Sequence, residues 1–280
     1  MIYSWAWPAL FCIVAIWGEL TLQSAFQVML CAVTLTAALS FGLLTWAVPR
    51  ADKRAAPAPT PALSLRQFTA LSLSLFSTEI VQVLVAALPA LVLGVVATKA
   101  DVGAYAMAWR LALALNLLVV AMAAFASPRF AAAAARDDSE ALQRTATQSL
   151  AITLALGVAP LAALAIGAPF WLGLFGEGFA SGATALRILL AGQAILMLAA
   201  CTPELLGMTG HERPLLRLNQ IAVLIYAPLL VALSVWANDV GAAIATVAIA
   251  LITGVGSSIL AQRHLGFVPL TLLFRVGRAK

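Results

Sequence analysis

Charged side chains are scarce in this sequence. They make up 10% of its 280 residues, whereas 63% of the residues are hydrophobic and the mean hydropathy is +1.03. Because a soluble domain carries roughly a quarter charged residues, this composition excludes a soluble globular protein. Long uninterrupted apolar runs favour helices over the alternating strands of a membrane barrel. We therefore predict an all-α, polytopic bundle of membrane helices.

Reactive and metal-binding side chains are also few. Three cysteines, Cys12, Cys31 and Cys201, fall inside apolar runs with a spacing unlike that of any metal site. We interpret them as packing residues and expect no disulfide, no metal and no cofactor. The two histidines, His211 and His264, stand apart from any acid–histidine motif, and no hydrolase, zinc-protease or phosphate-loop motif occurs. These absences predict that the chain is not an enzyme.

The longest polar stretch is Pro49–Arg66, which contains four prolines, one aspartate and four basic residues. Closely spaced prolines deny the backbone its helical hydrogen bonds and favour an extended, solvated linker. We predict a partial N-terminal bundle of about two spans over residues 1–49 and a cytoplasmic linker over 50–66. Residues 67–280 are predicted to form a six-helix C-terminal bundle with a cytoplasmic tail.

About eight apolar segments are candidate membrane spans. Each of the last seven reaches the ~20 residues that a helix needs to cross a bilayer. The first is marginal and begins almost at Met1, so we expect that upstream spans are missing and that the chain is a fragment. The segments are Ser4–Gly18, Ala25–Val48, Gln67–Ala97, Gly103–Ser127, Thr145–Ala168, Ala183–Leu206, Pro214–Trp236 and Gly241–Gln262.

Basic residues fall almost entirely on one side of these spans. If the spans alternate in direction, thirteen of the 16 lysines and arginines lie on the linker side, and only Lys99 lies on the other. Basic residues beside membrane spans are retained in the cytoplasm, which places both termini there. Because these residues flank apolar runs, the net charge of +5 indicates the lipid bilayer, and no nucleic acid, as partner.

Local signals predict how some helices begin and pack. Asp101 and Asp239 each precede Val-Gly-Ala and are predicted N-caps. Asp137-Asp-Ser-Glu140 indicates another capped helix start, with an ordinary solvated loop as the alternative. Small residues at every fourth position predict close contacts between helices. They are Ala104, Ala108 and Ala112 in one span, and Ala242, Thr246, Ala250, Gly254 and Ser258 in the last.

Four polar side chains in or beside the spans are candidate substrate-binding residues. Arg110 lies about 10 Å inside its span, where insertion of a charge costs at least ~2.5–3.5 kcal/mol. A cavity-facing role competes there with a structural ion pair or snorkelling. Arg187 lies near a span end and close to Glu177, which favours snorkelling or a loop salt bridge. Glu79 and Gln82 share a helix face and enter a cavity only if their helix is bent and tilted.

Gln193 and Glu204 also share a helix face, because they are eleven residues apart. Glu204 lies near the cytoplasmic end of its span. We favour an interfacial carboxylate there that pairs with Arg213 or Arg217.

Several short motifs follow one another from Leu91 onward: Leu93-Gly94, Val102–Leu111 (VGAYAMAWRL), Ser127-Pro128, Leu174–Phe179, Leu186–Leu189, Leu206–Gly210, Val240–Thr246 and His264–Gly266. In order and spacing, they resemble the polysaccharide (O-antigen type) flippases of the multidrug/oligosaccharidyl-lipid/polysaccharide exporter superfamily. The resemblance covers the C-terminal two-thirds and, more weakly, the spans before the linker. It implies two six-helix bundles around a cavity that opens alternately to either side, with most of the first bundle missing here.

The resemblance also implies a function and partners. The expected activity is the flipping of lipid-linked oligosaccharide precursors, such as those of O-antigen and lipopolysaccharide, to the outer leaflet. The diphosphate-lipid substrate, a polysaccharide polymerase and assembly proteins are the expected partners. Arg110 is the first candidate for a diphosphate contact and Arg187 the second. Glu79 and Gln82 are candidates for binding sugar hydroxyls or a coupling cation.

Two alternatives stay open. A multidrug exporter of the same superfamily would favour aromatic and acidic residues over arginines in the cavity. A membrane glycosyl- or acyltransferase of cell-envelope synthesis would lose product synthesis when His211, Glu212 or Glu204 is changed.

The distribution of basic residues gives a testable topology. Positions near Arg54, Arg136 and Arg213 are expected to face the cytoplasm, and Lys99 and Asp239 to face outward. Single cysteines on a cysteine-free background, treated with a membrane-impermeant thiol reagent in intact cells, test this. Rapid labelling at position 136 would contradict the topology.

Overall fold

The computed structural model describes Thr34, Ala38, Gly42 and residues 83–272. The chain divides into two compact units, Met1–Leu65 and Arg66–Lys280, and nearly all described residues belong to the second. The candidate residues Glu79 and Gln82, and almost all of the first two predicted spans and the linker, lie outside the described residues.

All regular elements in the described residues are helices, which confirms the predicted all-α fold. Four helical segments are long and apolar enough to cross a membrane: α4, α5, Gly178–Met208 and α9. A shorter apolar helix, Val83–Val96, lies within the third predicted span. The other elements, in chain order, are α4 (Lys99–Ala134), α5 (Ser139–Ile166), α6 (Ala168–Gly173), the 3₁₀ helix η1 (Glu177–Gly182), α7 (Ala183–Leu198), α8 (Thr202–Met208) and α9 (Glu212–Leu265).

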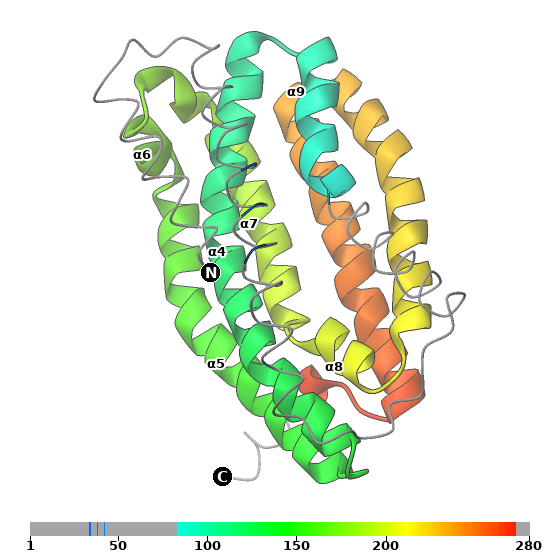
Figure 1. Ribbon diagram of the computed structural model, residues 1–280. Helices are drawn as coiled ribbons and strands as arrows, with labels where there is room; N and C mark the ends of the chain where they lie inside the picture. The colour runs from blue at the N-terminus through cyan, green and yellow to red at the C-terminus, as the bar shows by residue number, and fades with distance from the viewer. Residues whose placement is uncertain (1–33, 35–37, 39–41, 43–82, 273–280) are drawn as a thin grey trace. The chain divides into compact units, whose positions relative to one another are not determined.

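The long helix α9 covers both of the last two predicted spans. Its helical geometry is lost at Asn238, where φ is 47° and ψ is −124°. A side chain at Gly241 would collide with the carbonyl group of Leu233, so glycine is required at this reversal. The two halves of α9 then run side by side (Figure 1), and a Cβ added at Gly256 would meet the Leu218 side chain. The predicted break between the two spans is therefore confirmed.

The start of α4 corrects one predicted cap. The N-cap is Thr98, and Asp101 lies three residues inside the helix. The backbone N–H of Asp101 donates to Thr98 Oγ1, and the backbone N–H of Thr98 donates to Asp101 Oδ2, both at 3.3 Å. This reciprocal capping box satisfies two donors at the helix start, which a lone aspartate at the N-cap would not do.

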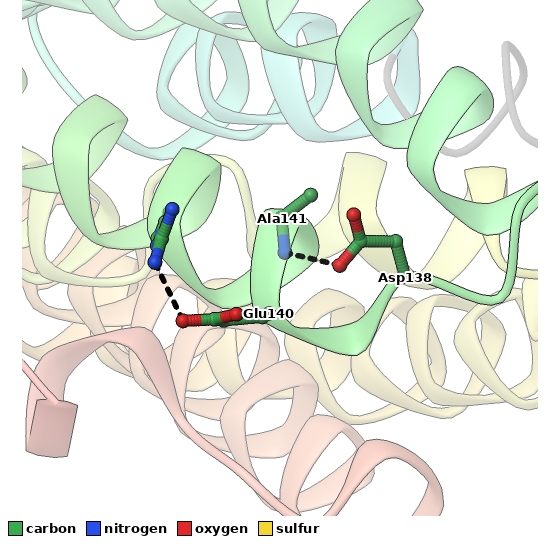
Figure 2. A network of polar contacts seen from close by, with 4 residues as sticks. Asp138, Glu140 and Ala141 are labelled. Atoms are coloured by element: carbon green, nitrogen blue, oxygen red, sulfur yellow. Dashed lines mark hydrogen bonds and ion pairs between the residues drawn. The ribbon is translucent and has the colours of Figure 1, made fainter.

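The start of α5 agrees with the capping signal in the sequence. Asp138 is the N-cap, and its Oδ1 accepts a hydrogen bond of 2.9 Å from the backbone N–H of Ala141. Glu140, in the first turn, forms an ion pair of 2.6 Å with Arg144 (Figure 2). Both charged side chains are well exposed, so the pair adds little stability and the cap is the more important contact.

The connections between the long helices lie at two opposite ends of the bundle. The α4–α5 connection and α8 lie at one end, and α6 lies at the other (Figure 1). Arg136 belongs to the α4–α5 connection, and Arg213 follows α8 at the start of α9, whereas Lys99 begins α4. The orientation of these ends in the membrane stays a prediction from the basic residues.

Small residues form the contact between α7 and the second half of α9, at Gly192 and Gly254. Ala242, Thr246, Ala250 and Gly254 of the predicted ladder are buried, and Ser258 is half-buried. The shorter ladder of α4, Ala104, Ala108 and Ala112, is buried as well. Both ladders therefore face other helices, as predicted, because small residues let helix backbones approach closely.

Replacing Gly254 with leucine is expected to destabilise the bundle. A Cβ at this position would lie 3.2 Å from Ile195 Cγ2 and 3.5 Å from Ala199 Cβ, both on or beside α7. Overpacking of this kind typically costs about 1–3 kcal/mol, so the midpoint of thermal unfolding in detergent should fall. Gly94→Leu is the matched control, since no atom lies within 4 Å of its added Cβ. Equal stability of the two variants would refute the contact.

Candidate functional site

A cavity of about 360 Å³ lies between α4, α7, α8 and both halves of α9. It lies where two apolar clusters meet: Leu189 and Ile249 belong to one cluster, and Ala200 and Cys201 to the other. Polar side chains in membrane helices are costly and usually face the interior of the bundle. The polar side chains of the cavity wall are Asn116, Gln193, Glu204, Asn219, Thr246, Thr253 and Ser257.

An interrupted helix forms one side of the cavity. α7 ends at Leu198 and α8 begins at Thr202, and Cys201 between them has a left-handed backbone conformation with φ 64°. Pro203, in the first turn of α8, cannot donate a backbone hydrogen bond and so favours a new helix start. Irregular backbone at membrane depth is tolerated where it lines a cavity, and Cys201 and Pro203 do line this one.

Gln193 and Glu204 both line the cavity, but they lie on different helices, α7 and α8, so the predicted shared face on one continuous helix is wrong. The interface pairing predicted for Glu204 is wrong. The one ion pair among the described residues joins Glu140 and Arg144, so Glu204 pairs with neither Arg213 nor Arg217. The sequence could not show that the break at Cys201 turns this carboxylate towards the cavity.

Three hydroxyl groups of the cavity wall donate their protons to the backbone, which leaves their oxygens as acceptors. Thr246, Thr253 and Ser257 donate their protons to backbone carbonyl oxygens three or four residues earlier, at 2.9, 2.9 and 3.0 Å. Tyr105 OH lies 3.2 Å from Thr246 Oγ1, so the tyrosine is the donor in that contact. Each hydroxyl has one proton, so Thr253 and Ser257 offer an occupant of the cavity their free lone pairs.

Arg110 does not line this cavity. Its neighbour Trp109 does, while the Arg110 side chain is exposed and its Nη1 lies 4.0 Å from Met107 Sδ. The described wall of the cavity contains no lysine or arginine. A contact of Arg110 with a diphosphate, predicted from the sequence, would have to form on the exposed face of α4.

Arg187 also lies outside the cavity wall. It is exposed on α7, and its Nε donates a hydrogen bond of 3.1 Å to the carbonyl oxygen of Ala165, in the last turn of α5. The carbonyls at a helix C-terminus lack intrahelical partners, so this contact caps α5. The predicted snorkelling or salt bridge of Arg187 is therefore replaced by a hydrogen bond to the end of α5.

A second, apolar hollow of about 500 Å³ lies against α7 and the second half of α9. It is bounded by α7, the second half of α9 and Val268 and Leu270 beyond it. Ala199 and Gly254 line both this hollow and the polar cavity. The contact between α7 and α9 therefore separates the first cavity from the apolar hollow.

A family model described as polysaccharide biosynthesis protein matches residues 7–178. The chain belongs to this family. The match covers more than half of the chain and includes the linker, the predicted spans before it, α4 and α5. No curated protein and no solved structure matches the chain.

Only some residues of the cavity wall lie within the range that the family model matches. Val85, Trp109 and Asn116 lie within the matched residues, whereas Gln193 and Glu204 lie beyond them. The resemblance predicted for residues 179–280 is therefore not covered by the match and stays a prediction. The sequence did identify Gln193 and Glu204 as a pair, but Asn116, Asn219 and Thr253 were missed because single polar residues in apolar helices gave no spacing signal.

Arg187→Met tests whether this arginine is structural. Loss of the contact with the Ala165 carbonyl should lower the free energy of unfolding by about 1 kcal/mol, since the side chain is exposed. Cell-surface polysaccharide per folded molecule should be unchanged. The measurement is the thermal midpoint in detergent together with cell-surface polysaccharide normalised to folded protein. Normal stability with lost cell-surface polysaccharide would instead support substrate binding by Arg187.

Proposed function

We propose that this membrane protein of polysaccharide biosynthesis moves a lipid-linked oligosaccharide from the inner to the outer leaflet of the bacterial cytoplasmic membrane. The single observation that carries the proposal is a cavity with polar side chains in its wall, lying between helices that are long and apolar enough to span a bilayer. Sugars and a diphosphate cannot cross hydrocarbon unaided, because their polar groups would lose all hydrogen bonds. Membership of the polysaccharide biosynthesis family supports a saccharide substrate, and the cavity supports a path for it through the membrane.

The depth of the cavity supports a transport pathway. Gln193 lies ten residues after Ala183, the first residue of α7, or about 15 Å along the helix. The hydrocarbon core of a bilayer is about 30 Å thick, so the amide would lie near its middle if α7 begins at the edge of that core. Transporters built from membrane helices commonly bind substrate near the midplane, beside interrupted helices such as α7–α8.

Transport without a chemical step is part of the proposal. The two histidines lie outside the cavity wall and contact each other, with ring centroids 4.7 Å apart. Both termini are proposed to lie in the cytoplasm. A polymerase and assembly proteins that use the flipped glycan are the proposed partners.

One observation favours a second candidate function. The cavity wall contains an aromatic residue, Trp109, and a carboxylate, Glu204, but no arginine among the described residues. This is the composition expected for an exporter of amphipathic cations, since a carboxylate and an aromatic face both attract positive charge. Membership of the polysaccharide biosynthesis family ranks this function second.

The decisive measurement is the leaflet in which the lipid-linked glycan accumulates. Depletion of the full-length protein should leave glycan synthesis intact while the outer-leaflet glycan, detected by an impermeant glycan-binding probe on spheroplasts, is lost. Arg110→Lys should restore export partly and Arg110→Ala poorly, if the exposed arginine binds the diphosphate through its planar fork.

Three other outcomes separate the alternatives. Loss of glycan synthesis itself on depletion would indicate a transferase. Unchanged glycan export with increased sensitivity to amphipathic cations would indicate the multidrug function. Normal export by a well-folded Arg110→Ala protein would exclude the phosphate contact and leave the flipping function intact.

A further inference from the structure

The side-chain oxygen of Gln193 is a buried acceptor without a hydrogen-bond partner. The residue is 5% exposed, and no hydrogen bond from its Nε2 is present in the described part of the chain. A buried polar group that lacks partners is costly, so native proteins rarely leave one unsatisfied. Gln193 also lines the cavity, so an occupant of the cavity can supply what the protein does not.

The surrounding groups determine which occupant fits. The hydroxyl protons of Thr253 and Ser257 are committed to carbonyl oxygens of α9, so both side chains present only acceptor lone pairs. Glu204 adds carboxylate oxygens, and the described wall holds no cationic side chain. The amides of Asn116, Gln193 and Asn219 add both donors and acceptors, so the wall favours an uncharged ligand that both donates and accepts hydrogen bonds. A diphosphate has only acceptors and carries negative charge, so it is disfavoured here.

We propose that Gln193, Thr253 and Ser257 form a subsite that binds sugar hydroxyls of the transported glycan and excludes its diphosphate. Each hydroxyl both donates and accepts, and can therefore satisfy the two ends of the Gln193 amide together with a neighbouring serine or threonine oxygen. The inference rests on the proposed flipping function and adds that the sugars and the diphosphate of the substrate bind at different places. The sugars lie in the cavity of the C-terminal bundle, and the diphosphate is bound elsewhere.

The test uses the purified full-length protein in detergent and two soluble probes. One probe is the neutral oligosaccharide released from its lipid carrier, and the other is inorganic pyrophosphate. The oligosaccharide should raise the midpoint of thermal unfolding of the wild-type protein, and pyrophosphate should leave it unchanged. Stabilisation by pyrophosphate alone, or by neither probe, would overturn the subsite.

Gln193→Met provides the sharper measurement. Methionine keeps the length of the side chain but removes the unpartnered amide, so the ligand-free protein should be as stable as wild type or more stable. The affinity for the oligosaccharide should fall about tenfold or more, because the polar contacts are lost. A less stable variant would show that the amide has a structural role, and unchanged affinity would show that it does not touch the sugar. Either result contradicts the proposal.

Ser234→Ala is the matched control. Ser234 is fully buried on α9 and its Oγ also lacks a partner, but the residue does not line the cavity. This variant should keep full affinity for the oligosaccharide, and a loss equal to that of Gln193→Met would contradict the proposal.

Measuring the leaflet in which the glycan accumulates tests the flipping function separately from the sugar subsite. Normal flipping by Gln193→Met with unchanged sugar affinity would remove the subsite and leave the flipping function in place. Sugar binding by wild type that depends on Gln193, without any leaflet change on depletion, would keep the subsite and remove the flipping function.

Discussion

The close approach of α7 to the second half of α9 is the contact on which the described bundle depends. Lipid tails are as apolar as leucine, so no hydrophobic force drives one membrane helix onto another. Association has to come from van der Waals contact, and that contact is closest where side chains are small. A Cβ added at Gly192 would touch Val247 at 3.4 Å, and one added at Gly254 would approach Ile195 still more closely, at 3.2 Å.

The same contact determines where the cavity can exist. Ala199 and Gly254 are too small to fill the space on either side of the helix pair, and both line the polar cavity as well as the apolar hollow. Shortly after Ala199 the helix is interrupted at Cys201, and α8 then contributes Pro203 and Glu204 to the cavity wall. Tight packing and an interrupted helix are therefore neighbouring features of one structural unit.

The cavity shows a division between polar groups that serve the fold and polar groups that do not. The hydroxyls of Thr246 and Thr253 bind backbone carbonyls of their own helix, and Tyr105 reaches Thr246 across the bundle. Gln193 makes no such bond among the described residues. An unpartnered polar atom is costly in a low-dielectric interior, so a ligand that bonds to this amide gains affinity, which is the basis of the inferred sugar recognition.

The sequence by itself determined the class of the protein, because apolar run length and proline-rich interruption act locally along the chain. It gave the all-α membrane fold, the cap at Asp138, the break near Asn238 and the inward direction of the small-residue ladders. Only the tertiary structure decided that Arg110 lies outside the cavity and Glu204 inside it, since the side of a helix that faces a neighbour depends on packing between distant segments. A charge count carries no such information: it finds the costly residues, and the contacts between helices decide which of them meet in space.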